Sequence, residues 1–138
     1  MLSNQKRAIR ILVIDQESDI RKSAETFLGN DGFWVESASN IESARRILQK
    51  ETPDIILIDY ELNRLGGTFI QNLRIDFPET KIVVLLYDCD KNNVREAIVA
   101  GADEFIRKPF NSADLMFIIE RLSRGTFQAS RSEITTGP

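Results

Sequence analysis

The chain of 138 residues is long enough for one domain with a hydrophobic core, and its net charge of -3 argues against a nucleic-acid-binding face, which needs clustered Lys and Arg. It contains no histidine, which excludes His-based catalytic triads, His metal sites and imidazole general bases. The only cysteine, Cys89, cannot form an internal disulfide, so we expect a reducing compartment, the cytoplasm. The polar, basic N-terminus does not resemble a signal peptide, and no stretch of sequence is long and apolar enough to predict a membrane span.

Five short apolar runs alternate with segments of helical periodicity along the chain. The runs predict strands at Ile9–Ile14, Phe33–Val35, Ile55–Ile58, Ile82–Leu86 and Glu104–Ile106. Three of the runs are nearly continuous Ile, Val and Leu, which is typical of strands covered on both faces of a parallel sheet. A repeated strand–helix order of this length predicts a single doubly wound α/β domain with helices on both faces of the sheet.

Amphipathic segments between these runs predict the crossover helices. The clearest is the last one, where Leu115, Ile118, Ile119 and Leu122 follow the spacing i, i+3, i+4 and i+7. The other apolar helix faces consist of Ile20, Ala24, Phe27 and Leu28; Ala44, Ile47 and Leu48; Phe69, Ile70, Leu73 and Phe77; and Val94, Ala97 and Ile98.

Polar residues and a glycine mark several predicted helix ends. Asn40 and Asn111 stand where helix N-caps are expected, and Gly101 stands where a helix should end. Beyond the last predicted helix the sequence becomes small, polar and aperiodic. We therefore expect one domain over residues 7–124 and a linker or tail over 125–138 that leads to an output domain.

Charged residues follow four of the predicted strands, at the edge where open parallel sheets bind ligands. The segments are Asp15-Gln16-Glu17, Asp59-Tyr60-Glu61, Tyr87-Asp88-Cys89-Asp90 and Arg107-Lys108-Pro109. Asp15, Asp59 and Lys108 should meet at this edge because each follows the carboxyl end of a strand. Two carboxylates and a lysine can hold a hard divalent cation such as Mg²⁺ together with a phosphoryl group.

The chain resembles the response-regulator receiver domain of two-component signalling in three motifs, ILVIDQE, DIILIDYEL followed by GG, and AGADEFIRKPF. The similarity covers roughly residues 7 to 124, in order and with the spacing of the family. The resemblance implies a flavodoxin-like five-stranded parallel sheet of order 2-1-3-4-5 and a role in phosphorelay signal transduction. A receiver is no enzyme in the usual sense, since it catalyses at most its own phosphorylation and dephosphorylation.

The same resemblance implies roles for individual residues. Asp59 would accept phosphate from a histidine kinase or phosphotransfer protein, and Lys108 would contact the phosphoryl group. Asp15, Asp59 and the backbone carbonyl of Glu61 would hold Mg²⁺. The Lys108–Pro109 bond resembles one that the family holds cis. An output domain and a second copy of the chain would be further partners.

Gln16 is the first departure from the family pattern, which has two adjacent acids after the first strand. Its amide carbonyl can still act as a metal ligand but brings no charge, and the loss costs ~2–4 kcal/mol of attraction to a dication at an effective surface dielectric. We therefore expect Gln16 to bind Mg²⁺ weakly. Glu17 is the nearest acid that could compensate, but its side chain is expected to leave the strand in a different direction.

The second departure is Leu86, which stands where the family has a Ser or Thr whose hydroxyl bonds the phosphoryl group. Leu86 cannot donate a hydrogen bond. A slip of one residue would place Tyr87 there, where its long phenol would crowd the phosphoryl group. In the family this hydroxyl couples to an aromatic residue on the fifth strand, here Phe105. A third, minor departure is Asn63, in the expected loop after the third strand, where proline is usual.

Three functions stay open from the sequence. The first is a phosphorylation switch, in which phosphate on Asp59 repacks the face formed by the helix near residues 94–98, strand Glu104–Ile106 and the last helix. The second is a degenerate receiver that acts as a phosphorylation-independent interaction module, which Gln16 and Leu86 favour. The third, remote alternative is a small phosphohydrolase that forms an aspartyl-phosphate.

Overall fold

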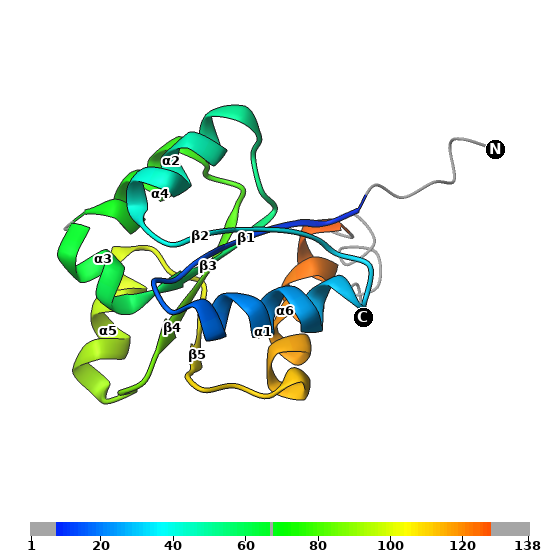
Figure 1. The fold of residues 1–138 in the computed structure, drawn as a ribbon. Coiled ribbons are helices and arrows are strands. Elements are labelled where there is room, and N and C mark those ends of the chain that lie inside the picture. The colour runs from blue at the N-terminus through cyan, green and yellow to red at the C-terminus, as the bar shows by residue number, and fades with distance from the viewer. Residues whose placement is uncertain (1–7, 67, 128–138) are drawn as a thin grey trace, which may run out of the picture.

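A five-stranded parallel sheet with helices on both faces forms the centre of the computed structural model, which describes residues 8–66 and 68–127 (Figure 1). The strand order is β2-β1-β3-β4-β5, which confirms the predicted flavodoxin-like topology. The strands are β1 (Arg10–Ile14), β2 (Trp34–Ala38), β3 (Ile55–Asp59), β4 (Lys81–Leu86) and β5 (Glu104–Arg107). The helices are α1 (Ser18–Gly29), α2 (Ile41–Lys50), α3 (Tyr60–Gly66), α4 (Phe69–Asp76), α5 (Lys91–Ala100) and α6 (Ser112–Phe127).

Two hydrophobic cores lie on opposite faces of the sheet. Alternate residues of β3 divide between them, because successive side chains of a strand point to opposite faces. Ile56 and Ile58 pack on the side of α2, α3, α4 and α5, whereas Ile55 and Leu57 pack on the side of α1 and α6. All four side chains are fully buried, and burying one such side chain contributes about 1.5–3 kcal/mol. The two cores hold the strand ends that carry the candidate site in fixed positions.

The edge strand β2 is longer than the sequence predicts, since it continues past Val35 to Ala38. It pairs with β1 from Trp34 opposite Arg10 to Ala38 opposite Ile14. Its residues alternate in exposure: Trp34 and Glu36 are exposed, whereas Ser37 is half-buried and donates a hydrogen bond of 2.6 Å to Glu25 on α1. A search for continuous apolar runs therefore finds only the start of β2.

Both predicted helix N-caps and the helix end predicted at Gly101 are confirmed. The side-chain oxygen of Asn40 accepts a hydrogen bond from the backbone N–H of Ser43, and that of Asn111 accepts one from the N–H of Asp114, both at 2.7 Å. Gly101 ends α5 with a φ of 126°, a conformation that favours glycine.

The expected loop after the third strand is instead the short helix α3, and this prediction was wrong. Asn63 lies inside α3, where a proline would remove a backbone N–H and break the helix. The Asn63 carboxamide is buried, and its oxygen accepts a hydrogen bond of 2.9 Å from the backbone N–H of Ile70 in the first turn of α4. Asn63 therefore permits α3 and caps the next helix.

The outer helix faces differ from the predicted pattern at two places. Ile98, predicted on the apolar face of its helix, is 46% exposed, because α5 buries Ala97 and packs Val94 against the sheet instead. Helix α6 continues to Phe127, past the boundary predicted at residue 124, and residues 128–138 of the predicted tail lie outside the described part.

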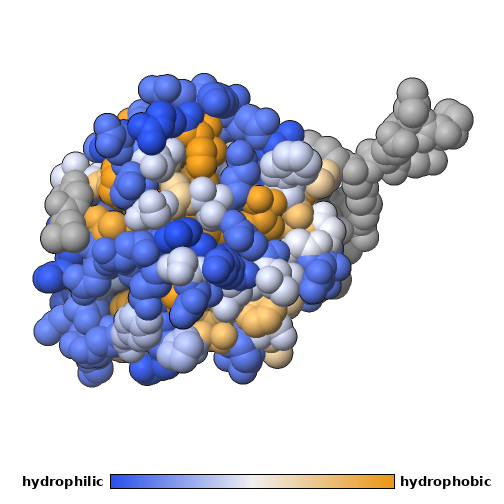
Figure 2. Space-filling model, in the orientation of Figure 1, coloured by the Kyte–Doolittle hydropathy of each residue, from blue (hydrophilic) through white to orange (hydrophobic). Residues whose placement is uncertain are grey.

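The hydropathy of the outer surface is what helices packed with their apolar faces inward should produce. The face seen in Figure 2 is mostly hydrophilic, with hydrophobic residues in separate spots. Within residues 8–66 and 68–127, the structure has no helix of the length and apolar character that a membrane crossing requires.

Candidate functional site

Three residues from three separate strand ends meet at the carboxyl edge of the sheet. Asp15 directly follows β1, Asp59 is the last residue of β3 and Lys108 directly follows β5. The Lys108 ammonium donates hydrogen bonds of 2.9 Å to Asp15 Oδ2 and of 2.9 Å to Asp59 Oδ1. The structure thus brings together the three side chains that the sequence predicts to meet.

This ion cluster is buried. The Lys108 side chain is 1% exposed and the Asp59 side chain 4%, while Asp15 is completely buried. Removing these charges from water is costly, and only their mutual pairing offsets the cost. The cluster is therefore a set of charges whose positions depend on one another.

The pKa values of two members reflect this environment. Burial raises the pKa of Asp15, against the lowering effect of hydrogen bonds from the Glu17 backbone N–H and the Lys108 ammonium. Burial alone would lower the pKa of Lys108, but hydrogen bonds to Asp15 and Asp59 and the charges of these carboxylates raise it above its usual value. Lys108 therefore remains an ammonium throughout the neutral range.

Glu17 also reaches the cluster, contrary to the direction expected for its side chain. Glu17 Oε2 lies 3.2 Å from Lys108 Nζ, and Glu17 Oε1 accepts a hydrogen bond of 2.6 Å from the Tyr87 hydroxyl. The turn that carries Glu17 is fixed because its backbone N–H donates to Asp15 Oδ1 at 2.9 Å. The hydrogen bond from Tyr87 lowers the pKa of Glu17. Partial burial acts in the opposite direction, and Lys108 lowers the pKa further.

Gln16 lies beside Asp59 rather than beside the ammonium. Its side-chain nitrogen is 3.4 Å from Asp59 Oδ2, so the amide donates a long hydrogen bond to the carboxylate. The amide group therefore contacts Asp59 as a donor, whereas a metal ligand must act through an oxygen.

Glu61 is placed differently from the expectation. It belongs to α3, and the backbone carbonyl of a helical residue points along the axis toward the next turn, where it accepts a hydrogen bond from a backbone N–H. Its side chain is exposed and pairs with Arg64 at 3.2 Å. The helix, which the sequence reading missed, makes the Glu61 carbonyl a poorer candidate ligand than a loop would.

The three predicted switch residues occupy different environments. Leu86 is buried in the core, and its backbone carbonyl accepts a hydrogen bond of 2.9 Å from the N–H of Lys108. Tyr87 is 51% exposed, and the centre of its ring lies 4.7 Å from Lys108 Nζ. Phe105 on β5 is partly buried against the core. Tyr87 thus covers the ammonium and binds Glu17. The peptide bond between Lys108 and Pro109 is cis.

Tyr60 is a residue at the site to which the sequence reading assigned no role. It directly follows Asp59 and is buried, and its one hydroxyl proton is shared between Glu96 and, at 3.2 Å, Asn93 Oδ1, both on α5. Burial and the bond to Glu96 raise the pKa of Tyr60 to about 12. The signal that could have revealed it is an aromatic residue with a polar end at the first position after a buried strand.

The chemistry of the donor set fits a hard divalent cation, because Asp15, Asp59 and Glu17 all offer carboxylate oxygens. Their oxygens are nevertheless arranged around the Lys108 ammonium. In the part of the chain that the structure describes, no group of three or more His, Cys, Asp or Glu side chains is arranged as a metal site. A cation would therefore have to compete with Lys108 for these oxygens.

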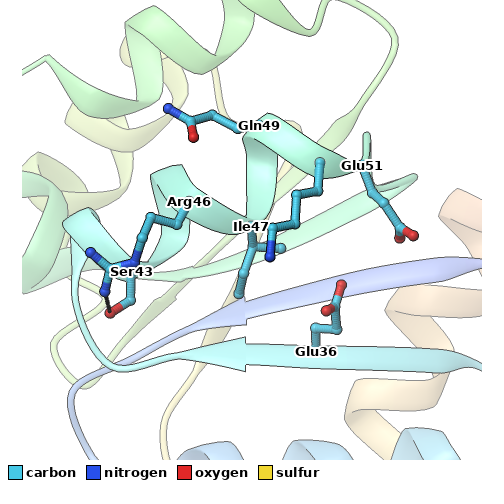
Figure 3. A pocket seen from close by; sticks show the side chains of 7 residues that line it. Glu36, Ser43, Arg46, Ile47, Gln49 and Glu51 are labelled. Atoms are coloured by element: carbon cyan, nitrogen blue, oxygen red, sulfur yellow. Dashed lines mark hydrogen bonds between the residues drawn. The ribbon is translucent and has the colours of Figure 1, made fainter.

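A surface pocket of about 430 Å³ lies elsewhere, between α2 and β2 (Figure 3). Both signs of charge line it, from Arg46 and Lys50 on α2 and Glu36 on β2. Arg46 is turned toward Ser43 and donates a hydrogen bond of 3.2 Å to its hydroxyl oxygen. It includes none of the residues that follow the strand ends. The candidate site is thus defined by its converging charges and not by the size of a cavity.

The family pattern of the response regulator receiver domain matches residues 11–120. The chain belongs to this family. The receiver fold is also seen in similar solved structures. A response regulator from Thermotoga maritima is 28% identical, with a TM-score of 0.80 over 84% of this chain and 98% of that chain. NtrX from Brucella abortus is 28% identical, with a TM-score of 0.81 over 93% of this chain and 30% of that chain.

Curated relatives of this receiver domain are longer regulators. The probable transcriptional regulator ycf27 of Guillardia theta is 32% identical over 129 residues, which cover 92% of this chain and 50% of the relative. The ycf27 regulator of Porphyra purpurea is 37% identical over 117 residues, covering 83% of this chain and 46% of the relative. The chain thus spans about half the length of these relatives, which are described as probable transcriptional regulators.

Proposed function

We propose that this receiver domain is a phosphorylation switch in which Asp59 accepts a phosphoryl group from a histidine kinase or phosphotransfer protein. The observation that carries the proposal is the buried contact of 2.9 Å between Asp59 Oδ1 and the Lys108 ammonium, with Asp15 on the same ammonium. A nucleophilic carboxylate next to a fixed cation suits phosphoryl transfer, because the cation can neutralise charge on the transferred group.

The chain's own residues have distinct parts in this reaction. An oxygen of Asp59 attacks the phosphorus, and the bond from phosphorus to the donor's histidine nitrogen breaks. The Lys108 ammonium, which now pairs with Asp59, exchanges one carboxylate contact for a phosphoryl oxygen. The amide of Gln16, 3.4 Å from Asp59 Oδ2, can donate a further hydrogen bond to that group. Bound Mg²⁺, held by Asp15 and Asp59, would supply additional positive charge for the transferred oxygens.

The switch would act on the face formed by α5, β5 and α6. Leu86 offers no hydroxyl to a phosphoryl group, so the Ser/Thr route that the family uses is missing. Tyr60 provides another route, because it adjoins Asp59 and is hydrogen-bonded to α5.

This face also offers apolar contacts to a partner, from the exposed Phe117 of α6 and the partly buried Phe105 of β5. We propose an output domain beyond the described residues or a second copy of the chain as its partner, in the cytoplasm.

The second candidate is an interaction module that keeps this face without using phosphate. Gln16 and Leu86 favour it, since each lacks a group that promotes phosphoryl chemistry. The third candidate, a small phosphohydrolase, has no comparable support, because Glu61 stands where the Asp-x-Asp pattern of such enzymes has its second Asp.

Incubation with Mg²⁺ and acetyl phosphate, followed by intact-mass measurement, separates the first two candidates. A switch should gain the mass of one phosphoryl group, and Asp59→Asn should abolish the gain while preserving the shape of the side chain. Beryllofluoride should shift NMR signals around Asp59 in the unmodified protein. If neither reagent acts at millimolar Mg²⁺, the phosphorylation switch is wrong. Turnover of a small phosphate ester would instead support the phosphohydrolase.

A further inference from the structure

We propose that the outer edge of β2, with the groove between β2 and α2, is a homodimer interface at which β2 pairs antiparallel with β2 of a second copy of this chain. In the described residues β2 is the terminal strand of the sheet and pairs with β1 alone. The opposite end of the sheet carries β5, so this interface is distinct from the face formed by α5, β5 and α6. It requires no phosphate on Asp59.

The backbone of β2 supplies the first argument. The N–H of Trp34 donates at 2.9 Å to the carbonyl just before β1, and the carbonyl of Ala38 accepts at 3.0 Å from the N–H just after β1. Backbone groups of alternate residues point toward opposite edges of a strand, so those of Val35 and Ser37 point away from the sheet. Such a row of backbone groups on an edge strand is a template for pairing with another chain.

The register of the pairing follows from this alternation. Residues that exchange both backbone hydrogen bonds lie directly opposite each other in an antiparallel pair. Val35 of one copy then lies opposite Ser37 of the other, about a twofold axis at Glu36. This register overlaps the whole of β2 and places the Trp34 ring, which is 54% exposed, opposite the small side chain of Ala38.

Charge complementarity between two copies is the second argument. The groove carries two bases on α2, Arg46 and Lys50, and an acid on β2, Glu36, all of them exposed. Over the described ranges of the chain, Glu36 and Lys50 form no ion pair, and Arg46 bonds only the hydroxyl of Ser43. A twofold axis at Glu36 brings the two carboxylates among the basic side chains of both copies. The second copy thus supplies partners that a single chain lacks.

Glu36 also determines which edges can pair. A charge on an edge strand commonly prevents pairing, and two Glu36 side chains opposite each other repel. At this axis, however, the bases of the two α2 helices outnumber the two carboxylates. Glu36 therefore selects a partner edge that carries bases beside it, and α2 of a second copy provides them.

The surface that would be covered is already ordered in the single chain. Figure 3 shows Ile47 pointing from α2 toward β2 and Glu36 pointing from β2 toward α2, so the groove has an apolar side chain beside its charges. At the start of β2 the Arg10 guanidinium lies 5.4 Å from the centre of the Trp34 ring and pairs with Glu51. An exposed aromatic ring that is already held loses little conformational entropy on binding.

Sedimentation equilibrium of the 138-residue chain, without phosphodonor and without Mg²⁺, tests the proposal. The chain should be monomeric at low micromolar and dimeric at millimolar concentration, because a strand of five residues makes a short interface. Added salt should weaken the dimer by screening its charges. Glu36→Lys should raise the dissociation constant by roughly tenfold or more, because it gathers like charges at the axis. Glu79→Lys, at an exposed position before β4, changes the net charge equally and should leave the dimer intact.

A mixing experiment makes the test specific to these charges. The double variant Arg46→Glu with Lys50→Glu should also fail to dimerise, because it gathers acids at the axis. Mixed with the Glu36→Lys variant, it should form a heterodimer, since each chain then meets the opposite charge. Thermal melting of each variant alone shows that it is folded before mixing.

Hydrogen exchange of the backbone amides locates the contact. The amides of Val35 and Ser37 should exchange roughly tenfold or more slowly at millimolar than at micromolar concentration, whereas that of Trp34, already bonded next to β1, should change less. A chain that stays monomeric at millimolar concentration overturns the proposal. So does a dimer that survives Glu36→Lys and is abolished by Phe117→Asp on α6. Protection of Val35 and Ser37 in the monomer also overturns it, because another segment of the chain then covers this edge.

Discussion

The Tyr87 hydroxyl donates a hydrogen bond of 2.6 Å to Glu17 Oε1, which joins the segment after β4 to the segment after β1 at the edge of the acidic site. These residues are 70 positions apart in the sequence. The bond places an exposed aromatic ring over the buried Lys108 ammonium. Both residues therefore contact the Lys108 ammonium, Glu17 through Oε2 at 3.2 Å and Tyr87 through its ring.

Removing the Tyr87 hydroxyl should raise the pKa of Glu17. The hydroxyl donates to the ionised carboxylate and is the main cause of the lowered pKa of Glu17, so Tyr87→Phe should return that pKa toward its usual value. An NMR pH titration of the Glu17 carboxyl carbon measures this directly. The substitution keeps the ring over Lys108, which isolates the hydroxyl. An unchanged pKa would show that the bond does not form in solution.

Replacing Lys108 by methionine should destabilise the fold strongly. The change leaves Asp15 and Asp59 buried without a counter-charge, which costs roughly 3–5 kcal/mol of unfolding free energy. Urea unfolding measures this loss, and Lys22→Met on the exposed side of α1 is a matched control that should change stability little. Mg²⁺ should restore part of the loss, because it binds the folded state alone. A variant as stable as the control would contradict the buried ion cluster.

The strand ends and their convergence could be predicted from the sequence, but the side-chain directions at the site could not. Asp15 and Asp59 follow nearly continuous apolar runs, and parallel strands bring their carboxyl ends to one edge, so the topology alone places them together. The direction of Glu17 depends on Tyr87, which is far away in the sequence, and no local pattern encodes such a contact. Asn63 inside α3 caps α4 through the N–H of Ile70, a side-chain contact that hydrophobic periodicity does not reveal.

Tyr60 should titrate at unusually high pH, and the free energy of unfolding should fall as it ionises. Its folded pKa of about 12 lies above the ordinary value of 10.0. The stability contributed by neutral Tyr60 is therefore complete below about pH 10 and is lost as the pH rises toward 12. The chain has two tyrosines, so Tyr87→Phe leaves Tyr60 as the only phenol in an ultraviolet absorbance titration. A midpoint near 10 would refute the buried hydrogen bond to Glu96.

Tyr60→Phe should weaken the connection between Asp59 and α5. The variant loses hydrogen bonds to Glu96 and Asn93 and should cost about 1 kcal/mol of unfolding free energy. Beryllofluoride should still shift NMR signals next to Asp59, whereas the shifts along α5 should become smaller than in the unmodified protein. Equal shifts along α5 in both proteins would mean that the signal reaches this helix by another route.

Asn63→Pro should unwind α3 and thereby test why the expected loop is a helix. Proline at this position removes a helical N–H and costs about 3 kcal/mol or more, and it also removes the cap on Ile70. Asn63→Ala is the matched control, because it loses the cap but keeps the helical backbone and should cost about 1–3 kcal/mol. Urea unfolding gives the two free energies, and hydrogen exchange of the α3 amides should accelerate more in the proline variant than in the alanine variant. If both variants exchange equally in α3, Asn63 does not determine the helix, and the tight packing of Tyr60 and Leu62 against the core must hold it instead.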